Sequence, residues 1–347
     1  MATGMPVIAR HLKSAVIAAV LLWLLAKGVD WAVLKAVFRP DLAACQALAH
    51  HGACWGVVSE KFRPLLLGHY PQAEHWRAWL ALALSGGMAA ITAAWALGRL
   101  ALPKGWMSGL SLAWALLSVL LMHGGLLGLT LVPIDAWGGL PLTIVLAVLS
   151  LALSLPPGIL LAMGRRSASA TLSTFCTTYI EVVRGVPLVT LLFMGAFMLP
   201  ALFPAQWQPS LFARVCLALT MFSAAYLAEI VRSGLQTVPR EQVEAAQVLG
   251  LGPWRIQQLV VLPQALRAAL PALVGHTIGL LKDTSLVMVV SVHELTGSLG
   301  LTLGGDPDWR PFYLEGYLFV AALYAAMCLS LGWVGRRLEA RWQGAVR

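Results

Sequence analysis

Charged residues are scarce in this chain. Asp, Glu, Lys and Arg together make up 11% of its 347 residues, whereas hydrophobic residues make up 59%. An ordinary soluble domain carries about 25% charged residues, so this composition excludes that class. Apolar runs of about 20 residues cross the hydrocarbon core of a bilayer as helices. We therefore expect an all-α, polytopic membrane protein.

The sequence also lacks any Gly-Lys step, and with it the phosphate-binding loop G-x-x-x-x-G-K-[ST]. No Ser-His-Asp order and no carboxylate pair within one span suggest hydrolysis. The eight histidines form no convincing metal constellation. We expect the chain not to be an enzyme and to hold neither cofactor nor metal. Any energy from ATP must then come from a partner subunit.

About eight membrane spans are expected. Five apolar stretches contain no charged residue: 78–98, 105–134, 136–164, 185–213 and 316–335. Three weaker stretches contain one or more charges: 14–38, 211–231 and 268–292. These spans divide the chain into a three-helix extension, residues 1–132 with an outer loop at 39–76, and a five-helix unit, residues 133–347.

The basic residues predict the orientation. Cytoplasmic loops of membrane proteins retain an excess of Lys and Arg. Most of the 24 Lys and Arg residues fall on one side if the loop at 233–263 and both termini are cytoplasmic. The net charge of +9 then indicates membrane topology and contact with anionic lipid, not nucleic acid.

A polar segment at 238–263 interrupts the apolar spans. Pro239 suits the first turn of a helix, and Gly250 suits the left-handed residue that ends one. A second short helix is expected from Trp254 to Val261, before Pro263 breaks the pattern again. Two helices this short cannot cross a bilayer, so the segment is expected to lie outside it.

The residues of this segment resemble the EAA loop of permease subunits in ATP-binding-cassette importers. The matching positions are Glu244, Ala245, Ala246, Gly250, Leu262 and Pro263, with Val260 where the family usually has Ile. The resemblance implies that this loop docks into a groove of a separate ATPase. One departure is Glu241, which stands where relatives usually have Gly. An acidic residue near a helix N-terminus is favourable by roughly 0.3 to 1 kcal/mol, so folding should not suffer.

Further matches extend along the five-helix unit. They are W-G-G-L-P-L-T at 137–143, G-R-R-S at 164–167, Y-I-E-V-V-R-G-V-P-L at 179–188, A-Y-L-A-E-I-V-R at 225–232 and K-D-T-S-L at 282–286. This pattern is similar to the polar-amino-acid branch of these permeases, especially the larger, eight-span subunit of general L-amino acid importers. The resemblance implies a bacterial inner-membrane location, an ABC ATPase dimer, a second permease and a periplasmic amino-acid-binding protein.

Charged residues inside the expected spans need their own explanation, because each costs roughly 2.5 to 3.5 kcal/mol at mid-helix on insertion scales. Lys282 and Asp283, with Thr284 and Ser285, are candidates for the translocation path. An adjacent ion pair near the inner end of the span is the alternative, and a secondary, ion-coupled transporter using the same pair is the alternative function. Glu229 and Arg232 are expected to form a salt bridge at the cytoplasmic face.

The five cysteines fall into two groups. Cys176, Cys216 and Cys328 lie in or beside spans and are expected to be inert. Cys45 and Cys54 lie in the outer loop, where a disulfide is expected in an oxidising periplasm and two free thiols are the alternative.

Overall fold

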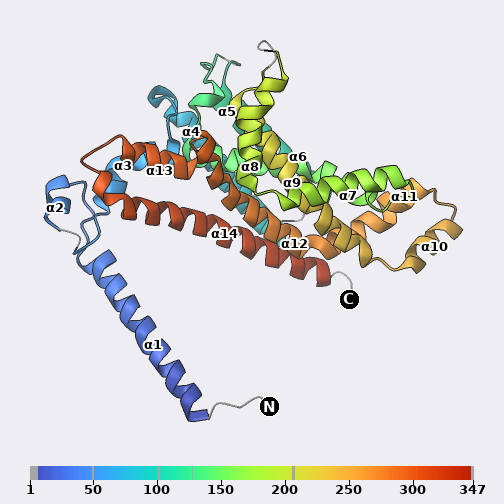
Figure 1. Cartoon of the computed structure of the whole chain (residues 1–347), viewed down its shortest axis with the longest axis horizontal. Coiled ribbons are helices and arrows are strands. Elements are labelled where there is room, and N and C mark those ends of the chain that lie inside the picture. The colour runs from blue at the N-terminus through green and yellow to red at the C-terminus, as the bar shows by residue number, and fades with distance from the viewer. Residues whose placement is uncertain (1–6, 49–50, 101, 127, 205–207, 345–347) are drawn as a thin grey trace. The chain divides into compact units, whose positions relative to one another are not determined.

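The computed structural model describes residues 7–48, 51–100, 102–126, 128–204 and 208–344. Within these ranges the chain forms helices and no strand (Figure 1). The α-helices are α1 Val7–Val29, α2 Leu42–Ala47, α3 Gly56–Leu67, α4 His75–Ala96, α5 Lys104–His123, α6 Gly139–Gly164, α7 Ala170–Gly185, α8 Leu188–Phe193, α9 Leu211–Gln236, α10 Arg240–Val248, α11 Pro253–Ile256, α12 Leu262–Asp283, α13 Leu295–Gly304 and α14 Tyr313–Gly344.

Short helical segments of other types join these helices. The π-helical segments are η1 Asp30–Leu34, η4 Met194–Met198 and η7 Gln257–Val261. The 3-10 segments are η2 Gln72–Glu74, η3 Ile134–Ala136, η5 Leu199–Leu202, η8 Thr284–Val290 and η9 Arg310–Phe312. The all-α prediction is confirmed.

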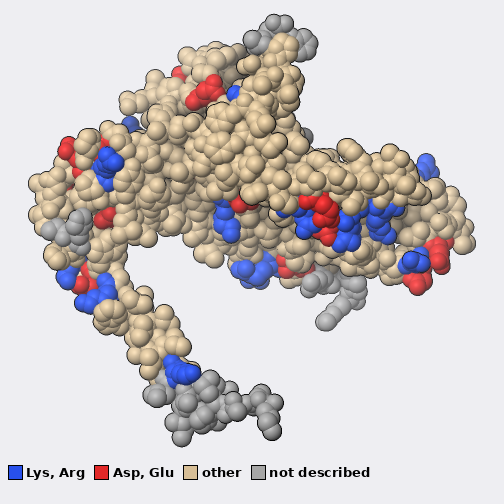
Figure 2. All heavy atoms as spheres, viewed as in Figure 1, with Lys and Arg blue, Asp and Glu red and all other residues tan. Residues whose placement is uncertain are grey.

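Six helical segments are long and apolar enough to cross a membrane: Lys13–Leu34, Gln72–Ala96, Gly139–Gly164, Leu211–Gln236, Pro253–Val290 and Arg310–Trp342. A seventh span results if α7 and the segment from α8 to η5, which meet at an angle of 104°, count as one broken span. The polytopic prediction is confirmed, with six or seven spans in the described residues instead of about eight. Figure 2 shows large areas of the visible face without a charged side chain.

Two expected spans are shorter than predicted. The stretch 105–134 forms only α5, because Gly124 and Gly125 take φ values of +69° and +76° and end the helix after His123. The stretch 185–213 is broken at Pro187, which precedes α8, and α9 starts only at Leu211. Apolar composition alone therefore overestimates helix length where glycine and proline redirect the backbone.

Contacts divide the chain into two compact units: unit 1, residues 1–62 with 302–319, and unit 2, residues 63–301 with 320–347. This division differs from the one made at residue 132 on sequence grounds, which concerned spans and stays a prediction. Each unit is described by itself.

In unit 1, the loop after η1 is fastened to residues distant in sequence. The structure joins Cys45 and Cys54 in a disulfide, with Cα atoms 5.4 Å apart. The backbone N–H of Cys54 donates to Oε1 of the buried Glu315 at 2.9 Å. Lys61 Nζ lies 2.6 Å from Asp306 Oδ2, and its hydrogen bond holds the pKa of Asp306 below the usual range.

In unit 2, α9 packs most extensively against α6 and α12. Small residues permit this approach. A Cβ at Gly158 of α6 would lie 2.8 Å from the Leu227 side chain, and one at Gly234 of α9 would lie 2.3 Å from the carbonyl oxygen of Ala265 in α12. Close helix approach through small residues is typical of packing in membranes, where apolar surface gains nothing by leaving lipid.

The helix pair α4 and α5 belongs to unit 2. Arg77 of α4 is fully buried and closes the end of α5, donating to the carbonyls of Leu121 at 2.6 Å and Met122 at 3.1 Å. Its Nη1 also donates to the carbonyl of Thr130 at 2.8 Å. The bonds to Leu121 and Met122 satisfy carbonyl groups that a helix C-terminus leaves unpaired.

Candidate functional site: the α9–α12 loop and the end of α12

The loop between α9 and α12 starts where a side chain caps the C-terminus of α9. The Thr237 hydroxyl donates to the carbonyl of Gly234 at 2.8 Å, directly after α9. Pro239 follows with an extended ψ of 144° and stands immediately before α10. A missing N–H is harmless there, because the first N–H groups of a helix have no intrahelical acceptor.

The end of α10 is a Schellman motif. Gly250 has φ +77°, as its sequence position predicted, and its N–H donates to the carbonyl of Gln247 at 2.9 Å. The N–H of Leu251 donates back to the carbonyl of Ala246 at 3.1 Å. No described atom lies within 4 Å of the place that a Cβ on Gly250 would take. Backbone conformation, and not space inside this chain, therefore favours glycine at this position.

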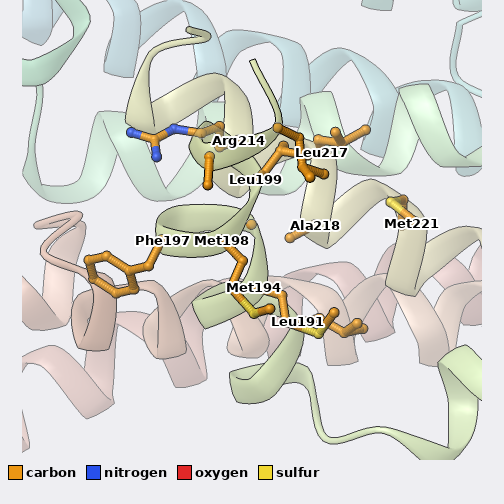
Figure 3. A pocket seen from close by; sticks show the side chains of 12 residues that line it. Leu191, Met194, Phe197, Met198, Leu199, Arg214, Leu217, Ala218 and Met221 are labelled. Atoms are coloured by element: carbon orange, nitrogen blue, oxygen red, sulfur yellow. The ribbon is translucent and has the colours of Figure 1, made fainter. Parts of the chain in front are cut away.

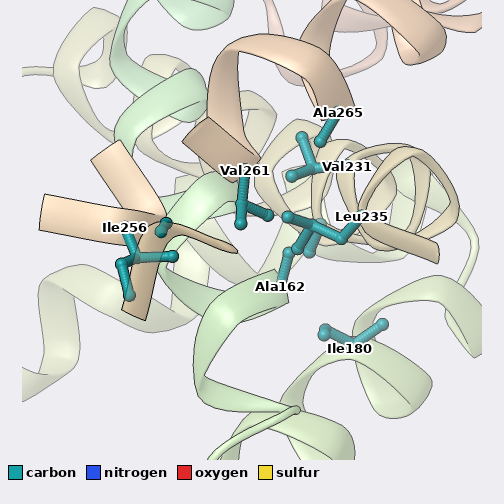
Figure 4. Packing of buried hydrophobic residues seen from close by; sticks show 9 residues of the cluster. Ala162, Ile180, Val231, Leu235, Ile256, Val261 and Ala265 are labelled. Atoms are coloured by element: carbon teal, nitrogen blue, oxygen red, sulfur yellow. The ribbon is translucent and has the colours of Figure 1, made fainter. Parts of the chain in front are cut away.

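Ala246 attaches α10 to the rest of unit 2. Its side chain is 4% exposed and belongs to a buried apolar cluster, part of which is seen in Figure 4. The cluster collects Ala162, Ile180, Ala228, Val231, Leu235, Ala246, Ile256, Val261 and Ala265 from α6, α7, α9, α10, α11, η7 and α12. Because packed interiors deform little, a displacement of α10 must shift these helix ends with it.

The other side of α10 is open. Glu244 and Ala245 are exposed, and so are Val248 at 88% and Leu249 at 80%. Trp254 of α11 adds another exposed apolar side chain. Thus Glu244 and Ala245, predicted to contact a partner, are accessible, whereas Ala246 faces the cluster. Sequence reasoning missed Val248 and Leu249, although two apolar residues before Gly250 in a polar segment are a detectable signal.

The loop does not end in a break at Pro263. The turn before it is π-helical, and the N–H of Leu262 donates to the carbonyl of Gln257. Pro263 stands in the first turn of α12, where its lack of an N–H is tolerated. The expected second short helix therefore continues through η7 into α12. Leu262 is half-buried and Pro263 is exposed.

A charged cluster lies at the helix ends near this loop. Glu229 of α9 pairs with Arg232, as the sequence predicted, and also with Arg165 at 3.2 Å and Arg184 at 3.9 Å. Arg165 pairs in addition with Glu181 of α7 at 3.0 Å. Three arginines, one directly after α6, one in α7 and one in α9, thus share one carboxylate. The cytoplasmic location of this cluster stays a prediction.

The candidate path residues lie where α12 passes into η8. Lys282 is exposed and Asp283 is half-buried, and within the described residues they form no ion pair with one another. Thr284 is buried and donates to the carbonyl of Leu281 at 2.7 Å, whereas Ser285 donates to the carbonyl of Lys282 at 2.7 Å. Both hydroxyls therefore bond to their own helix. A role of Lys282 and Asp283 in the translocation path stays a prediction, and so does the alternative of an adjacent pair.

Sequence reasoning missed a buried polar chain across three helices. Ser154 of α6 lies 2.8 Å from Ser223 of α9, whose hydroxyl lies 2.8 Å from Nε2 of His276 in α12. The His276 ring stacks on Tyr226, with centroids 6.1 Å apart, and the Arg184 guanidinium lies 5.5 Å from the centroid of the same Tyr226 ring. His276 of α12 is thus held by a hydrogen bond to the neighbouring helix α9.

A second polar centre was not foreseen. The buried carboxylate of Glu294 accepts from the hydroxyls of Thr143 at 3.2 Å and Tyr324 at 2.6 Å. It also accepts from the N–H groups of Thr296 at 2.8 Å and Gly297 at 3.0 Å, at the start of α13. Glu294 therefore joins α6, α13 and α14. Glu is not among the residues that preferentially cap helix N-termini, so the local sequence gave no clear signal for this centre.

Comparison with known proteins shows which family this sequence matches. Residues 154–344 match the family described as "Binding-protein-dependent transport system inner membrane component". An Escherichia coli relative, the "Inner membrane amino-acid ABC transporter permease protein YhdY", is 43% identical over 59% of this chain and 56% of its own length. The "Glutamate/glutamine/aspartate/asparagine transport system permease protein BztC" of Rhodobacter capsulatus is 40% identical over 59% of this chain and 47% of its own.

A solved structure agrees with these sequence matches. The "Crystal structure of an amino acid ABC transporter with histidines" superposes with a TM-score of 0.52 and 30% identity, over 58% of this chain and 92% of that one. The chain spans about half the length of the first two relatives named above. The family match nevertheless includes more than half of the chain, with α9, the α10 loop, α12 and all of α14. The chain belongs to the family of binding-protein-dependent transport system inner membrane components.

Proposed function

We propose that this chain is a permease subunit of an ATP-driven amino-acid importer and that α10 couples it to an ATPase. The observation that carries the proposal is the two-sided character of α10. One side is held in the buried cluster through Ala246, and the other presents Glu244, Ala245, Val248 and Leu249. A helix that transmits movement from a partner needs fixed contacts within its own chain on one side and an accessible surface for the partner on the other.

The proposed partners follow from the same relatives. Two copies of an ABC ATPase would receive the coupling helices, a second permease would complete the channel, and a periplasmic amino-acid-binding protein would deliver substrate. The proposed location is the bacterial inner membrane, with both termini and the 233–263 loop in the cytoplasm. Lys282 and Asp283 are proposed to face the translocation path, where an exposed Lys can be hydrated.

In this mechanism, ATP binding closes the ATPase pair and moves α10. The buried cluster passes that movement to the ends of α6, α9 and α12, and the translocation cavity between the two permeases opens to the outside. ATP hydrolysis returns the transporter to its starting state. Amino-acid selectivity would be determined chiefly by the binding protein. The chain itself would have no enzymatic activity. Family membership supports this role and gives no support to the ion-coupled alternative built on Lys282 and Asp283.

The test compares two glycines of the same loop. Gly250→Asp forces a non-glycine residue into a left-handed conformation, which costs about 1 kcal/mol, and adds a side chain at the exposed end of α10. Gly252→Asp is the matched control, because Gly252 has φ −70° and no described atom lies within 4 Å of the place that its Cβ would take. Each variant is expressed with its ATPase, partner permease and binding protein.

We measure the amount in the membrane, co-purification of the ATPase, and ATP-driven amino-acid uptake. Gly250→Asp should insert normally, because no hydrocarbon-facing residue changes, while ATPase association and uptake fall sharply. Gly252→Asp should retain more of both. Normal uptake with a normally bound ATPase in Gly250→Asp would remove the coupling role of α10.

A further inference from the structure

A groove in unit 2 lies apart from the coupling loop. It has a volume of about 590 Å³ and runs between α9 and the irregular segment formed by α8, η4 and η5 (Figure 3). This volume is within the ~300–1,000 Å³ typical of ligand pockets. Its walls are apolar and include Met194, Met198 and Met221, flexible side chains that adapt to irregular apolar partners.

Among the described residues, one charged side chain lines this groove. Arg214 stands in the first turns of α9, and its Nη1 donates to the carbonyl of Ala196 in η4. Its Nε is buried without a hydrogen-bond partner among the described residues. None of the ion pairs found among those residues includes Arg214. A half-buried guanidinium beside apolar walls therefore lacks a counter-ion from the described part of this chain.

We propose that this groove binds an anionic glycerophospholipid, with the phosphate at Arg214 and one acyl chain along the methionine-lined wall. The lining is complementary to both parts of such a lipid: the Arg214 guanidinium suits the phosphate, and the apolar side chains suit the acyl chain. Arg214 lies close to the end of a membrane helix, where an arginine reaches the headgroup layer.

An amino-acid substrate fits this lining poorly. A zwitterion carries an ammonium group as well as a carboxylate, and the described lining contains no Asp or Glu to receive the ammonium. The groove shares α9 with the α10 cluster but no residue: its walls come from α8, η4, η5 and α9 residues before Ser223, whereas the cluster uses α9 from Ala228 onward. The proposal is therefore independent of the coupling role of α10.

The test titrates the purified full chain, in neutral detergent, with single lipids and counts bound molecules by native mass spectrometry. The probes are phosphatidylglycerol, zwitterionic phosphatidylcholine and glycerol phosphate, which is the headgroup without acyl chains. Variants are Arg214→Gln, Arg214→Lys and Ala201→Trp, which fills the groove from an exposed position and leaves the cation in place. Arg310→Gln, at an exposed arginine of η9 outside the lining, is the matched charge control.

One phosphatidylglycerol should bind more tightly than phosphatidylcholine. Arg214→Gln should weaken it about fivefold, the effect of one basic residue near a lipid surface, whereas Arg214→Lys and Arg310→Gln should stay within about twofold of the original. Ala201→Trp should weaken both lipids. Equal affinity for the two lipids, no effect of Arg214→Gln, or equal binding of glycerol phosphate would overturn the proposal. So would displacement of the lipid when the partner permease is added, because the groove would then be a subunit interface.

Discussion

The helix ends around α10 in unit 2 and the loop around the Cys45–Cys54 disulfide in unit 1 are held together by different interactions. Around α10, small residues pack closely: Ala246 is buried in the apolar cluster, and Gly234 brings α9 against the backbone of Ala265, with the ion pairs of Glu229 nearby. In unit 1, the Cys45–Cys54 disulfide, the bond from Cys54 to Glu315 and the Lys61–Asp306 pair fasten the chain.

This difference has a physical consequence. Apolar packing at backbone contact tolerates changes of pH and redox state but not added volume, because interiors are close-packed. A disulfide and ion pairs tolerate added volume nearby better, but they are sensitive to redox state and pH. Close packing of this kind suits a region proposed to move as one body, and a few strong links suit a loop that has little regular structure.

The largest expected effect comes from volume at Gly234. Gly234→Leu places a side chain against the carbonyl oxygen of Ala265, 2.3 Å from the Cβ position, and backbone cannot yield as a side chain can. Overpacking typically costs roughly 1 to 3 kcal/mol, and we expect about 3 kcal/mol or more here. The measurement is thermal unfolding of the purified chain together with its yield in the membrane.

The control is Gly279→Leu on α12, where a Cβ would meet no described atom within 4 Å. It should unfold close to the original temperature when the chain is studied alone. If both glycine variants unfold at the same temperature, close approach of α9 and α12 does not stabilise the coupling region in the way proposed.

Loss of the disulfide should have the next largest effect and should act on unit 1. The bond closes a loop of sequence separation 9, for which the chain-entropy model gives roughly 2 to 3 kcal/mol. In Cys45→Ser with Cys54→Ser, hydrogen exchange should accelerate at 51–62 and stay unchanged at 240–262. Recovery of both thiols from native membranes by alkylation without prior reduction would contradict the pairing.

The sequence predicted the features that depend on local chemistry. Gly250 has the left-handed φ that its position after α10 suggested, and Glu229 pairs with Arg232 one helical turn away. Both outcomes need only backbone preference or short-range charge. The end of α5 was predicted wrongly, because it depends on the two glycines after His123 and on Arg77, a residue 44 positions before its acceptor Leu121.

Long-range partners could not be read from a single sequence. The Glu294 carboxylate gathers Thr143 and Tyr324, which are 151 and 30 positions away, and nothing in their local pattern pairs them. Likewise, Ala246 was assigned to a partner contact because its place in the motif is known, whereas which side of α10 is buried depends on α6, α9 and α12. Local rules predicted α10 and its ends, but only the packing shows which side of this helix is buried.

A smaller effect is expected at Glu315. Its Oε1 accepts the N–H of Cys54 at 2.9 Å, and Cys54 is fully buried. Glu315→Leu leaves that N–H without an acceptor, which should cost about 1 to 2 kcal/mol. Glu315→Gln keeps a carbonyl oxygen and should recover most of the loss. Local exchange at 51–62 is the measurement, and equal exchange in both variants would show that the bond contributes nothing.

The smallest effect concerns pH and the Lys61–Asp306 pair. The hydrogen bond from Lys61 lowers the pKa of Asp306 in the folded state relative to the unfolded chain. A group with a depressed folded pKa stabilises the fold above its unfolded pKa of about 4, and this contribution is lost as pH falls through the folded pKa.

Both side chains of the Lys61–Asp306 pair are partly exposed, so salt should weaken the effect further. Asp306→Asn should therefore lower hydrogen-exchange protection at 302–310 at pH 7 by a small amount, and this difference should shrink as pH falls below about 4. Asp308→Asn, which leaves the pair intact, serves as the control. A difference between the original chain and Asp306→Asn that persists unchanged at pH 3 would mean that the side-chain amide, and not the lost ion pair, causes it.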